Sequence, residues 1–282
     1  MSEEVKTIYL CLAHMSEEGY EQKYVKEAFD TNWVVPMGPN VYTFEQNLAD
    51  FSNANLDGSK LDRKVVCLSA GTAAVHLALI ACGVQLGDEV CVQSFTFCAS
   101  SHPITYLGAK PVFIDSEKET WNMDPELLEK AIIDRKEKTG KYPKAIIPVA
   151  LYGMPYDCER IMVIADKYGI PVIEDAAEGM GSRYNGQVLG TFGRFGVLSF
   201  NGNKMITTSG GGALICRSDE DANNIMWHAT QARDAYPYYQ HTEIGYNYRM
   251  SNVCAGIGRG QMTVLDAHIA HHKHVQELYE EL

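Results

Sequence analysis

A lysine in unusual surroundings is the first candidate for chemistry in this sequence. Lys204 follows an apolar run, Gly196 to Phe200, that indicates a buried strand, and it precedes a turn rich in Thr, Ser and Gly at 207–212. An amine at a strand end, with hydroxyls and backbone N–H groups nearby to hold an anion, is suited to reach a ligand in a pocket. An ordinary lysine of a surface loop is the alternative. A P-loop is excluded, because no Gly-x-x-x-x-Gly-Lys-[Ser/Thr] spacing occurs.

Two other strand ends carry groups that complement this amine. Asp175 follows the apolar run 171–174, where a buried carboxylate needs a cationic or hydrogen-bonding partner, although a helix N-cap is the alternative role. Gly71 and Thr72 open a helix after the run 64–68, so they can cradle a phosphate or form an ordinary turn. An amine for a Schiff base, an acid for a ring nitrogen and an anion site are together what pyridoxal 5′-phosphate requires. The sequence therefore predicts this cofactor.

Short apolar runs and helical patterns alternate from residue 64 onward, which predicts the elements that position these groups. This alternation is typical of an α/β fold with a mainly parallel sheet sandwiched by helices, whose ligands bind at the carboxyl ends of the strands. The N-terminal part predicts two helices, at 18–30 and 42–51, and Asn185-Gly186 predicts a tight hairpin. The expected strands are 64–68, 89–92, 111–114, 145–149, 171–174, 196–200 and 213–216, and the expected helices between and after them are 72–82, 100–107, 125–134, 158–168, 219–231, 252–261 and 268–282.

Composition narrows the class of protein. The 282 residues are 46% hydrophobic, which is enough for a substantial core, and 36 acids against 24 Lys and Arg give a net charge of −12. An acidic chain is a poor partner for nucleic acid. No apolar stretch reaches the roughly 18 residues of a membrane helix, and the acidic N-terminus lacks the apolar core of a signal peptide, so we expect no membrane association.

Cysteines and histidines are the residue types that could support metal or redox chemistry. The eight cysteines, Cys11 among them, are scattered without a Cys-x-x-Cys pair, which predicts reduced thiols in a cytoplasmic protein. His268, His271, His272 and His274 share helical spacing, but no carboxylate or cysteine is in register with them. A solvated helix is the better interpretation, and no metal site is predicted.

Four spaced motifs resemble those of the DegT/DnrJ/EryC1/StrS family of nucleotide-sugar aminotransferases. They are Ser69 to Ala74, Pro171 to Glu178, Gly196 to Gly212 and Gly245 to Ser251, and the resemblance runs from about residue 7 to the end. It implies the aspartate aminotransferase fold (fold type I), with a seven-stranded type of sheet. It also implies a large cofactor-binding domain at 1–255, with 256–282 starting the connection to a small C-terminal domain that is truncated or missing here.

The resemblance also implies a role for each matching residue. Lys204 and Asp175 are the implied catalytic residues: Lys204 binds the cofactor, and Asp175 pairs with the ring nitrogen of the cofactor. The other cofactor-binding residues are Gly71, Thr72 and Ser199 at the phosphate, Phe97 stacked on the ring, Glu178 near the ring hydroxyl, Asn201 as a neighbour, and Asn247, which is lent to the neighbouring subunit of a homodimer.

The implied activity is transfer of an amino group, with L-glutamate the expected donor, to a nucleotide-linked 4-keto-6-deoxy sugar. Such a step supplies precursors of surface polysaccharides. Two alternatives stay open at this point. One is a pyridoxal phosphate-dependent dehydratase of the same family, against which Lys204 argues because the dehydratases that abandon the Schiff base carry histidine there. The other is a catalytically silent regulatory protein of the same fold.

Overall fold

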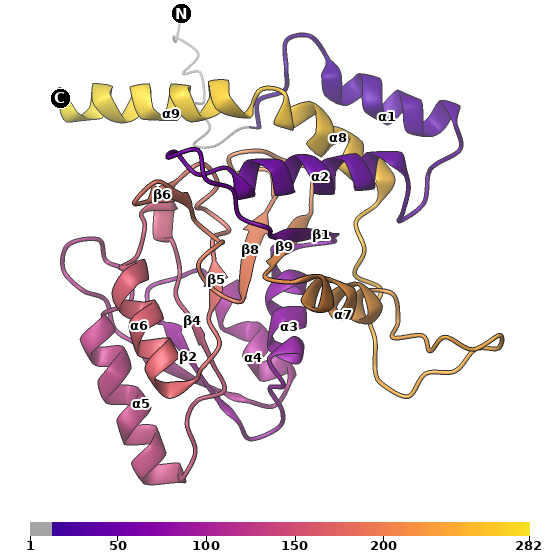
Figure 1. Cartoon of the computed structure of the whole chain (residues 1–282). Helices are drawn as coiled ribbons and strands as arrows, with labels where there is room; N and C mark the ends of the chain where they lie inside the picture. The colour runs from indigo at the N-terminus through magenta and orange to yellow at the C-terminus, as the bar shows by residue number, and fades with distance from the viewer. Residues whose placement is uncertain (1–12) are drawn as a thin grey trace, which may run out of the picture.

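The computed structural model describes residues 13–282, so the thiol predicted at Cys11 lies outside the described residues. Within this range, seven strands lie side by side at the centre of the fold in the order β1-β9-β8-β5-β4-β2-β3 (Figure 1). Bridges between Ile146 and Val172 and between Val149 and Asp175 join β4 to β5. The strands are β1 (Lys64–Leu68), β2 (Glu89–Gln93), β3 (Lys110–Ile114), β4 (Ala145–Ile147), β5 (Ile173–Asp175), β8 (Phe195–Ser199) and β9 (Gly212–Cys216).

Strand direction follows the prediction of a mainly parallel sheet. The pairs β2/β3, β2/β4 and β5/β8 are parallel, whereas β9 runs antiparallel to both β1 and β8. A separate hairpin of β6 (Arg183–Tyr184) and β7 (Gln187–Val188) turns at Asn185-Gly186, where both residues have positive φ. That hairpin is confirmed, because the left-handed conformation of a two-residue turn favours Asn and Gly.

Helices cover both faces of the sheet, as expected. They are α1 (Tyr20–Asp30), α2 (Pro39–Asn53), α3 (Gly71–Ala81), α4 (His102–Tyr106), α5 (Pro125–Thr139), α6 (Cys158–Tyr168), α7 (Asp219–Ala229), α8 (Asn252–Met262) and α9 (Leu265–Glu280), with short 3₁₀ turns η1 (Cys98–Ser100) and η2 (Leu151–Gly153). One core contains Phe44 of α2, Leu128 of α5 and Ile161 of α6, and the other contains Leu77 of α3 and Ile225 of α7. The sheet is thus buried on both sides.

Most predicted helices differ from the structure by a few residues at their ends, and two differ more. The helix expected at 100–107 is divided into η1 and α4, because Pro103 has no N–H to continue a helix and instead occupies the first turn of a new one. The helix expected to end at 134 continues to Thr139 and stops where Gly140 adopts a left-handed conformation, with φ of 76°. Neither difference changes the path of the chain between the neighbouring strands.

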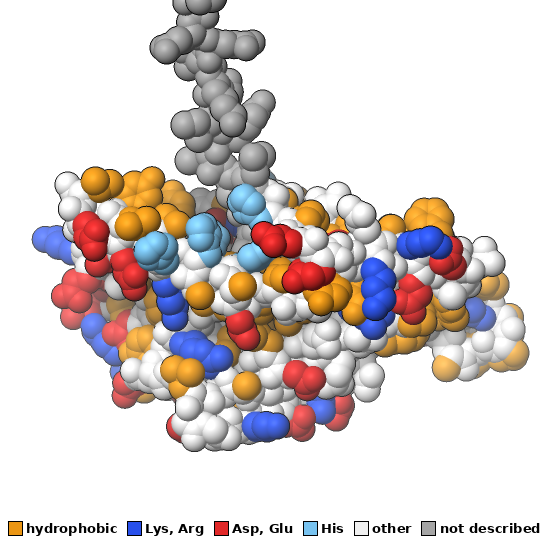
Figure 2. Space-filling view, turned by 90° about the horizontal axis from the view of Figure 1, so that it is seen from above, with side chains coloured by type: hydrophobic (Ala, Val, Ile, Leu, Met, Phe, Trp, Pro, Cys, Tyr) orange, Lys and Arg blue, Asp and Glu red, His pale blue; other side chains and the backbone are white. Residues whose placement is uncertain are grey.

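The C-terminal helix α9 carries the histidine run on a largely exposed face. Figure 2 shows histidine side chains gathered on this surface, and His274 lies 3.5 Å from Glu277. Among residues 13–282, no group of three or more His, Cys, Asp or Glu side chains is arranged to hold a metal ion. The seven cysteines of the same range are free thiols, five of them buried, and Cys98 is exposed. No described helix is both long and apolar enough to cross a membrane.

Candidate active site

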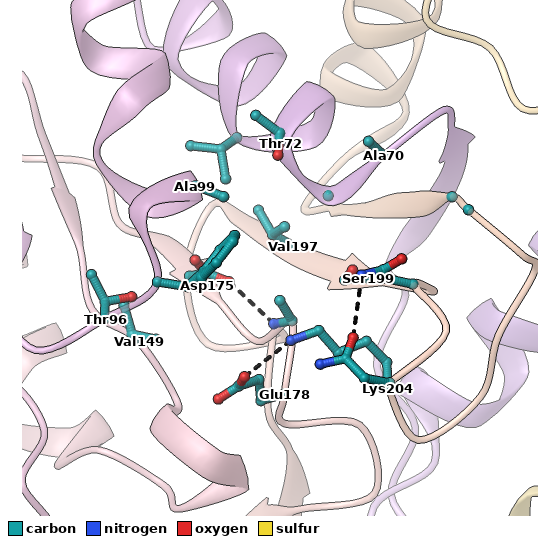
Figure 3. Close-up of a pocket in the computed structure, with 18 of the residues that line it drawn as sticks. Ala70, Thr72, Thr96, Ala99, Val149, Asp175, Glu178, Val197, Ser199 and Lys204 are labelled. Carbon is teal, nitrogen blue, oxygen red and sulfur yellow. Dashed lines mark hydrogen bonds and ion pairs between the residues drawn. The ribbon is translucent and has the colours of Figure 1, made fainter. Parts of the chain in front are cut away.

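A cavity of about 480 Å³ opens at the carboxyl ends of the central strands (Figure 3). Asp175 is the last residue of β5, Ser199 is the last of β8, and the turn after β1 brings Gly71 to the same edge. This is where a parallel α/β sheet presents its loops to a ligand. Of the nine predicted site residues, eight line the cavity: Gly71, Thr72, Phe97, Asp175, Glu178, Ser199, Asn201 and Lys204.

The amine of Lys204 is held by a carboxylate inside this cavity. Its Nζ donates to Oε1 of Glu178 at 3.0 Å, and both side chains are largely buried. The other carboxylate oxygen of Glu178 accepts the backbone N–H of Tyr152 at 2.7 Å, and Tyr152 has a positive φ of 53°. A non-glycine residue in this conformation is uncommon and requires support from its surroundings. Glu178 therefore fixes both the lysine amine and the turn opposite it.

Asp175 is buried, with 6% of its surface exposed. Its Oδ2 accepts from the hydroxyl of Ser100 at 2.5 Å, and its Oδ1 accepts from the N–H of Ala177 at 3.2 Å. Burial raises the pKa of Asp175 above its ordinary value, and the hydrogen bond from Ser100 and the charge of Lys204 offset part of that rise. A buried carboxylate at a cavity wall is stabilised most by a cationic ligand group, such as a protonated ring nitrogen.

The N-terminus of α3 and the end of β8 form a site suited to an anion. The first turn of a helix leaves backbone N–H groups without intrahelical partners, and Ala70 supplies no side-chain cap for them. The hydroxyls of Thr72 and Ser199 also face the cavity, and neither has a hydrogen-bond partner among residues 13–282. A Cβ built at Gly71 would lie 3.2 Å from Cβ of Ser199, so glycine lets the two segments approach closely.

Two predicted residues lie at the cavity with less constraint. Phe97 is 73% exposed at the start of η1, which leaves its ring available to a planar ligand. Asn201 lies on the loop before Lys204, and its amide donates to Asn203 at 3.3 Å. Both residues line the cavity, and their contacts with a cofactor stay predictions.

Asn247 is the predicted residue that does not line the cavity. It pairs through its backbone with Thr230 and is exposed. The sequence prediction assigned Asn247 to the site of a neighbouring subunit, so its position outside this chain's own cavity is compatible with that role. The role itself stays a prediction.

The loop that carries Lys204 is connected to α8 and α1 by hydrogen bonds. Within the loop, Thr208 N–H and the hydroxyl of Thr207 both donate to the carbonyl of Phe200, at 3.0 and 3.2 Å. Thr207 N–H donates to Oε1 of Gln261 on α8 at 3.3 Å, and the amide of Gln261 donates in turn to Glu21 of α1 at 2.7 Å. A buried hydrogen-bonded network therefore fixes the base of the lysine loop.

Sequence reasoning missed three polar residues of this arrangement. The hydroxyl of Ser100 donates to Asp175, which lies 75 positions later in the chain. The hydroxyl oxygens of Thr96 and Ser100 are 2.7 Å apart. Gln261 accepts a hydrogen bond from Thr207 in the loop that carries Lys204. The only local signal was the spacing of Thr96 and Ser100 four residues apart just after a strand, which brings two hydroxyls near one another in a tight turn.

Two curated proteins are similar to this chain in sequence. EpsN of Bacillus subtilis (strain 168) is 49% identical over 264 residues, which cover 94% of this chain and 65% of EpsN. GDP-perosamine synthase of Escherichia coli O157:H7 is 37% identical over 272 residues, covering 96% of this chain and 71% of the synthase. The chain thus spans about two thirds of the length of these relatives.

A solved structure and a family model match the same region. The structure of Spr1654 from Streptococcus pneumoniae in its PLP form superposes with a TM-score of 0.81 at 27% identity, over 93% of this chain and 68% of that one. The model of the DegT/DnrJ/EryC1/StrS aminotransferase family matches residues 15–282. The match extends over nearly all of the described residues, and the chain therefore belongs to the DegT/DnrJ/EryC1/StrS aminotransferase family.

Proposed function

We propose that this chain is the cofactor-binding part of a pyridoxal phosphate-dependent aminotransferase acting on nucleotide-linked keto sugars. The observation that carries the proposal is the convergence of Lys204, Asp175 and the Gly71/Ser199 anion site on one cavity at the sheet edge. Each of these groups has an ordinary structural role when taken alone. Their meeting in one cavity, with Gly71 more than 100 positions before Asp175 and Lys204, is best explained by one ligand with an aldehyde, a ring nitrogen and a phosphate.

The residues present fit this cofactor by their donor chemistry. The unpartnered hydroxyls of Thr72 and Ser199, with the N-terminus of α3, would hold the phosphate. The buried carboxylate of Asp175 would hold the ring nitrogen in its protonated form, and the exposed ring of Phe97 would cover one ring face. When bound, the cofactor supplies an electron sink for bonds broken at the substrate carbon that bears nitrogen.

Lys204 and Glu178 would transfer protons next to the bound cofactor. The amine of Lys204 has to lose a proton before it acts as a nucleophile or as a base, and Glu178 accepts a hydrogen bond from it at 3.0 Å. Glu178 is thus placed to stabilise the ammonium form and to receive its proton. The amine can then move a proton to or from the substrate carbon in the cavity.

The substrates belong to the proposal as well. L-glutamate is the expected amino donor, and the acceptor is a nucleotide-linked 4-keto-6-deoxy sugar used for surface polysaccharide. The relative named GDP-perosamine synthase supports a nucleotide-linked sugar as acceptor. Seven free thiols among the described residues support a cytoplasmic location.

A homodimer and a further domain complete the proposal. Asn247 is exposed and outside its own cavity, which suits a residue lent to the site of a second copy. Exposed apolar side chains of the adjacent loop, Tyr238, Tyr239 and Ile244, supply surface for such a contact. The domain division expected after residue 255 falls inside α8, so α8 would belong to both the large domain and the connection that follows it.

The test starts from the colour of the bound cofactor. We expect the purified protein mixed with pyridoxal phosphate to show a visible absorbance that Lys204→Ala loses, together with at least about a 10⁴-fold loss of turnover, because nucleophile and base are removed at once. Lys64→Ala, which removes a lysine at the start of β1, should change neither property. Retention of the same absorbance by Lys204→Ala would overturn the proposal.

Products then separate the reaction classes. Incubation with glutamate and a panel of nucleotide keto sugars should give 2-oxoglutarate and an amino sugar in equal amounts. A dehydratase would give neither product. A silent regulatory protein would bind the cofactor but would not react with any amino acid.

A further inference from the structure

A chain of two hydroxyls lies behind the carboxylate of Asp175. Ser100 is 1% exposed and does not line the cavity, yet its Oγ lies 2.5 Å from Oδ2 of Asp175. On its other side, Oγ of Ser100 lies 2.7 Å from Oγ1 of Thr96, which does line the cavity. The structure therefore places a buried hydrogen-bonded chain between a cavity wall and the carboxylate.

The direction of this chain depends on the charge of Asp175. An ionised carboxylate only accepts hydrogen bonds, and a serine hydroxyl has a single proton to donate. When Asp175 is ionised, Ser100 must therefore donate to Asp175, and Thr96 must donate to Ser100. The distance of 2.5 Å is that of a charge-assisted O–H···O⁻ bond, which is stronger than a bond between neutral groups.

The rest of Asp175 is fixed by the backbone. Its N–H donates to the carbonyl of Pro148 at 2.9 Å, and its own carbonyl accepts from Ala150 at 3.0 Å. Oδ1 accepts from Ala177, so each carboxylate oxygen has one protein donor and the side chain has a single supported orientation. Ser100 is the one side chain bonded to this carboxylate among residues 13–282.

We propose that Ser100, supported by Thr96, is a positioning residue that keeps the carboxylate of Asp175 ionised and aimed into the cavity. The proposal deepens the proposed function and rests on it where the cofactor is concerned. Other groups also act on this carboxylate: burial raises the pKa of Asp175, the charge of Lys204 lowers it, and the charge of Glu178 raises it. The hydroxyl of Ser100 stabilises the ionised carboxylate of Asp175 only in the orientation that allows their hydrogen bond. Loss of this hydroxyl leaves the buried charge of Asp175 with one hydrogen-bond donor fewer.

The first experiment uses the protein without cofactor. Aspartate labelled with ¹³C at Cγ allows the titration of Asp175 to be followed by NMR, with Asp175→Asn to assign the signal. We expect Ser100→Ala to raise the pKa of Asp175, because the charged form loses its hydrogen bond. Ser100→Thr keeps the hydroxyl and should preserve the wild-type titration. Ser101→Ala is the matched control, since Ser101 donates to the carbonyl of Cys98 and not to Asp175.

The second experiment measures cofactor binding. Ser100→Ala should weaken pyridoxal phosphate by about 10-fold, which corresponds to the loss of one hydrogen bond to a charged group, while Ser100→Thr and Ser101→Ala bind as wild type does. With ¹⁵N in the pyridine ring, the ring nitrogen signal should move toward the unprotonated form in Ser100→Ala. Thr96→Val should weaken cofactor binding and move the ring nitrogen signal in the same direction as Ser100→Ala, but by less. This variant replaces Ser100→Ala in the test if Ser100→Ala does not fold.

The outcomes separate this inference from the proposed function. An Asp175 titration in Ser100→Ala and Thr96→Val identical to that of Ser101→Ala would overturn the positioning role alone. Failure of the wild-type protein to bind pyridoxal phosphate would overturn the proposed function, whatever the titration of Asp175 shows.

Discussion

Polar groups in two regions of this molecule differ in how their hydrogen bonds are satisfied. In the layer of α1 and α8, the carboxylate of Glu21 accepts from Ser16 and Gln261, and the amide of Gln261 also bonds to Thr207. At the sheet edge, the hydroxyls of Thr72 and Ser199 have no such partner among residues 13–282. The paired groups of the helical layer stabilise the fold, whereas the unpaired hydroxyls at the cavity are available to bind a ligand.

The pKa directions of two acids express the same contrast. Burial works to raise the pKa of Glu21, but hydrogen bonds from Ser16 and Gln261 outweigh it and leave the pKa below its ordinary value. For Asp175, burial raises the pKa, and the donors offset it only in part. Ionised Glu21 thus contributes stability that is lost as the pH falls through its lowered pKa, whereas ionisation of Asp175 opposes folding until a cationic ligand arrives.

The largest expected effect comes from breaking this contrast at the sheet edge with Asp175→Asn. The loss of the charge that holds a protonated ring nitrogen should lower turnover by about 100- to 1,000-fold, as for removal of other preorganised electrostatic groups. The free energy of unfolding without cofactor should not fall, because Asn can accept from Ala177, donate to Ser100 and carry no buried charge. Steady-state kinetics measures the loss of turnover, and urea unfolding measures the free energy of unfolding. An Asp175→Asn variant that is less stable than wild type but fully active would contradict the role of Asp175 at the ring nitrogen.

Next in size is Gln261→Met in the helical layer. The change leaves the N–H of Thr207 and the carboxylate of Glu21 each without one partner, and such losses cost about 2–4 kcal/mol of unfolding free energy. Urea unfolding checks this against Gln276→Met, an exposed change on α9 that should stay within about 0.5 kcal/mol of wild type. Equal stability of the two variants would mean that the packing of α1 and α8 does not depend on the hydrogen bonds of Gln261.

This contrast also shows what the sequence could and could not predict. The strand 64–68 and the helix 158–168 were predicted with their observed bounds, because hydrophobic periodicity is a local signal. Lys204 and Asp175 were predicted as site residues because both come at or after the ends of apolar runs that indicate strands, and both line the cavity. Ser100 and Gln261 were missed because their partners lie 75 and 240 positions away, at Asp175 and Glu21, and only the packed structure brings them together.

The last expected effect concerns Glu45 of α2, a buried acid whose carboxylate is only partly satisfied by hydrogen bonds. Its Oε1 accepts the N–H of Cys67 from edge strand β1 at 2.9 Å. Burial raises the pKa of Glu45 to about 7, and the bond from Cys67 and the charge of Arg249 offset only part of the rise. Glu45 is therefore a structural acid that holds its proton well above the pH at which an exposed glutamate releases it.

Glu45→Gln tests this structural role through pH. In wild type the unfolded chain releases the Glu45 proton near pH 4.5 and the folded chain near pH 7, so this residue lowers the free energy of unfolding as the pH rises across that window. Gln keeps an acceptor for Cys67 but has no proton to lose, so the variant should gain about 3 kcal/mol over wild type at pH 8 and almost nothing at pH 4.5. Urea unfolding across this range measures the difference, with Asp50→Asn, an exposed acid on the same helix, as the control that should show no such gain. A constant difference between Glu45→Gln and wild type at every pH would mean that Glu45 ionises as an exposed acid does, and that the packing of α2 on β1 does not depend on its proton.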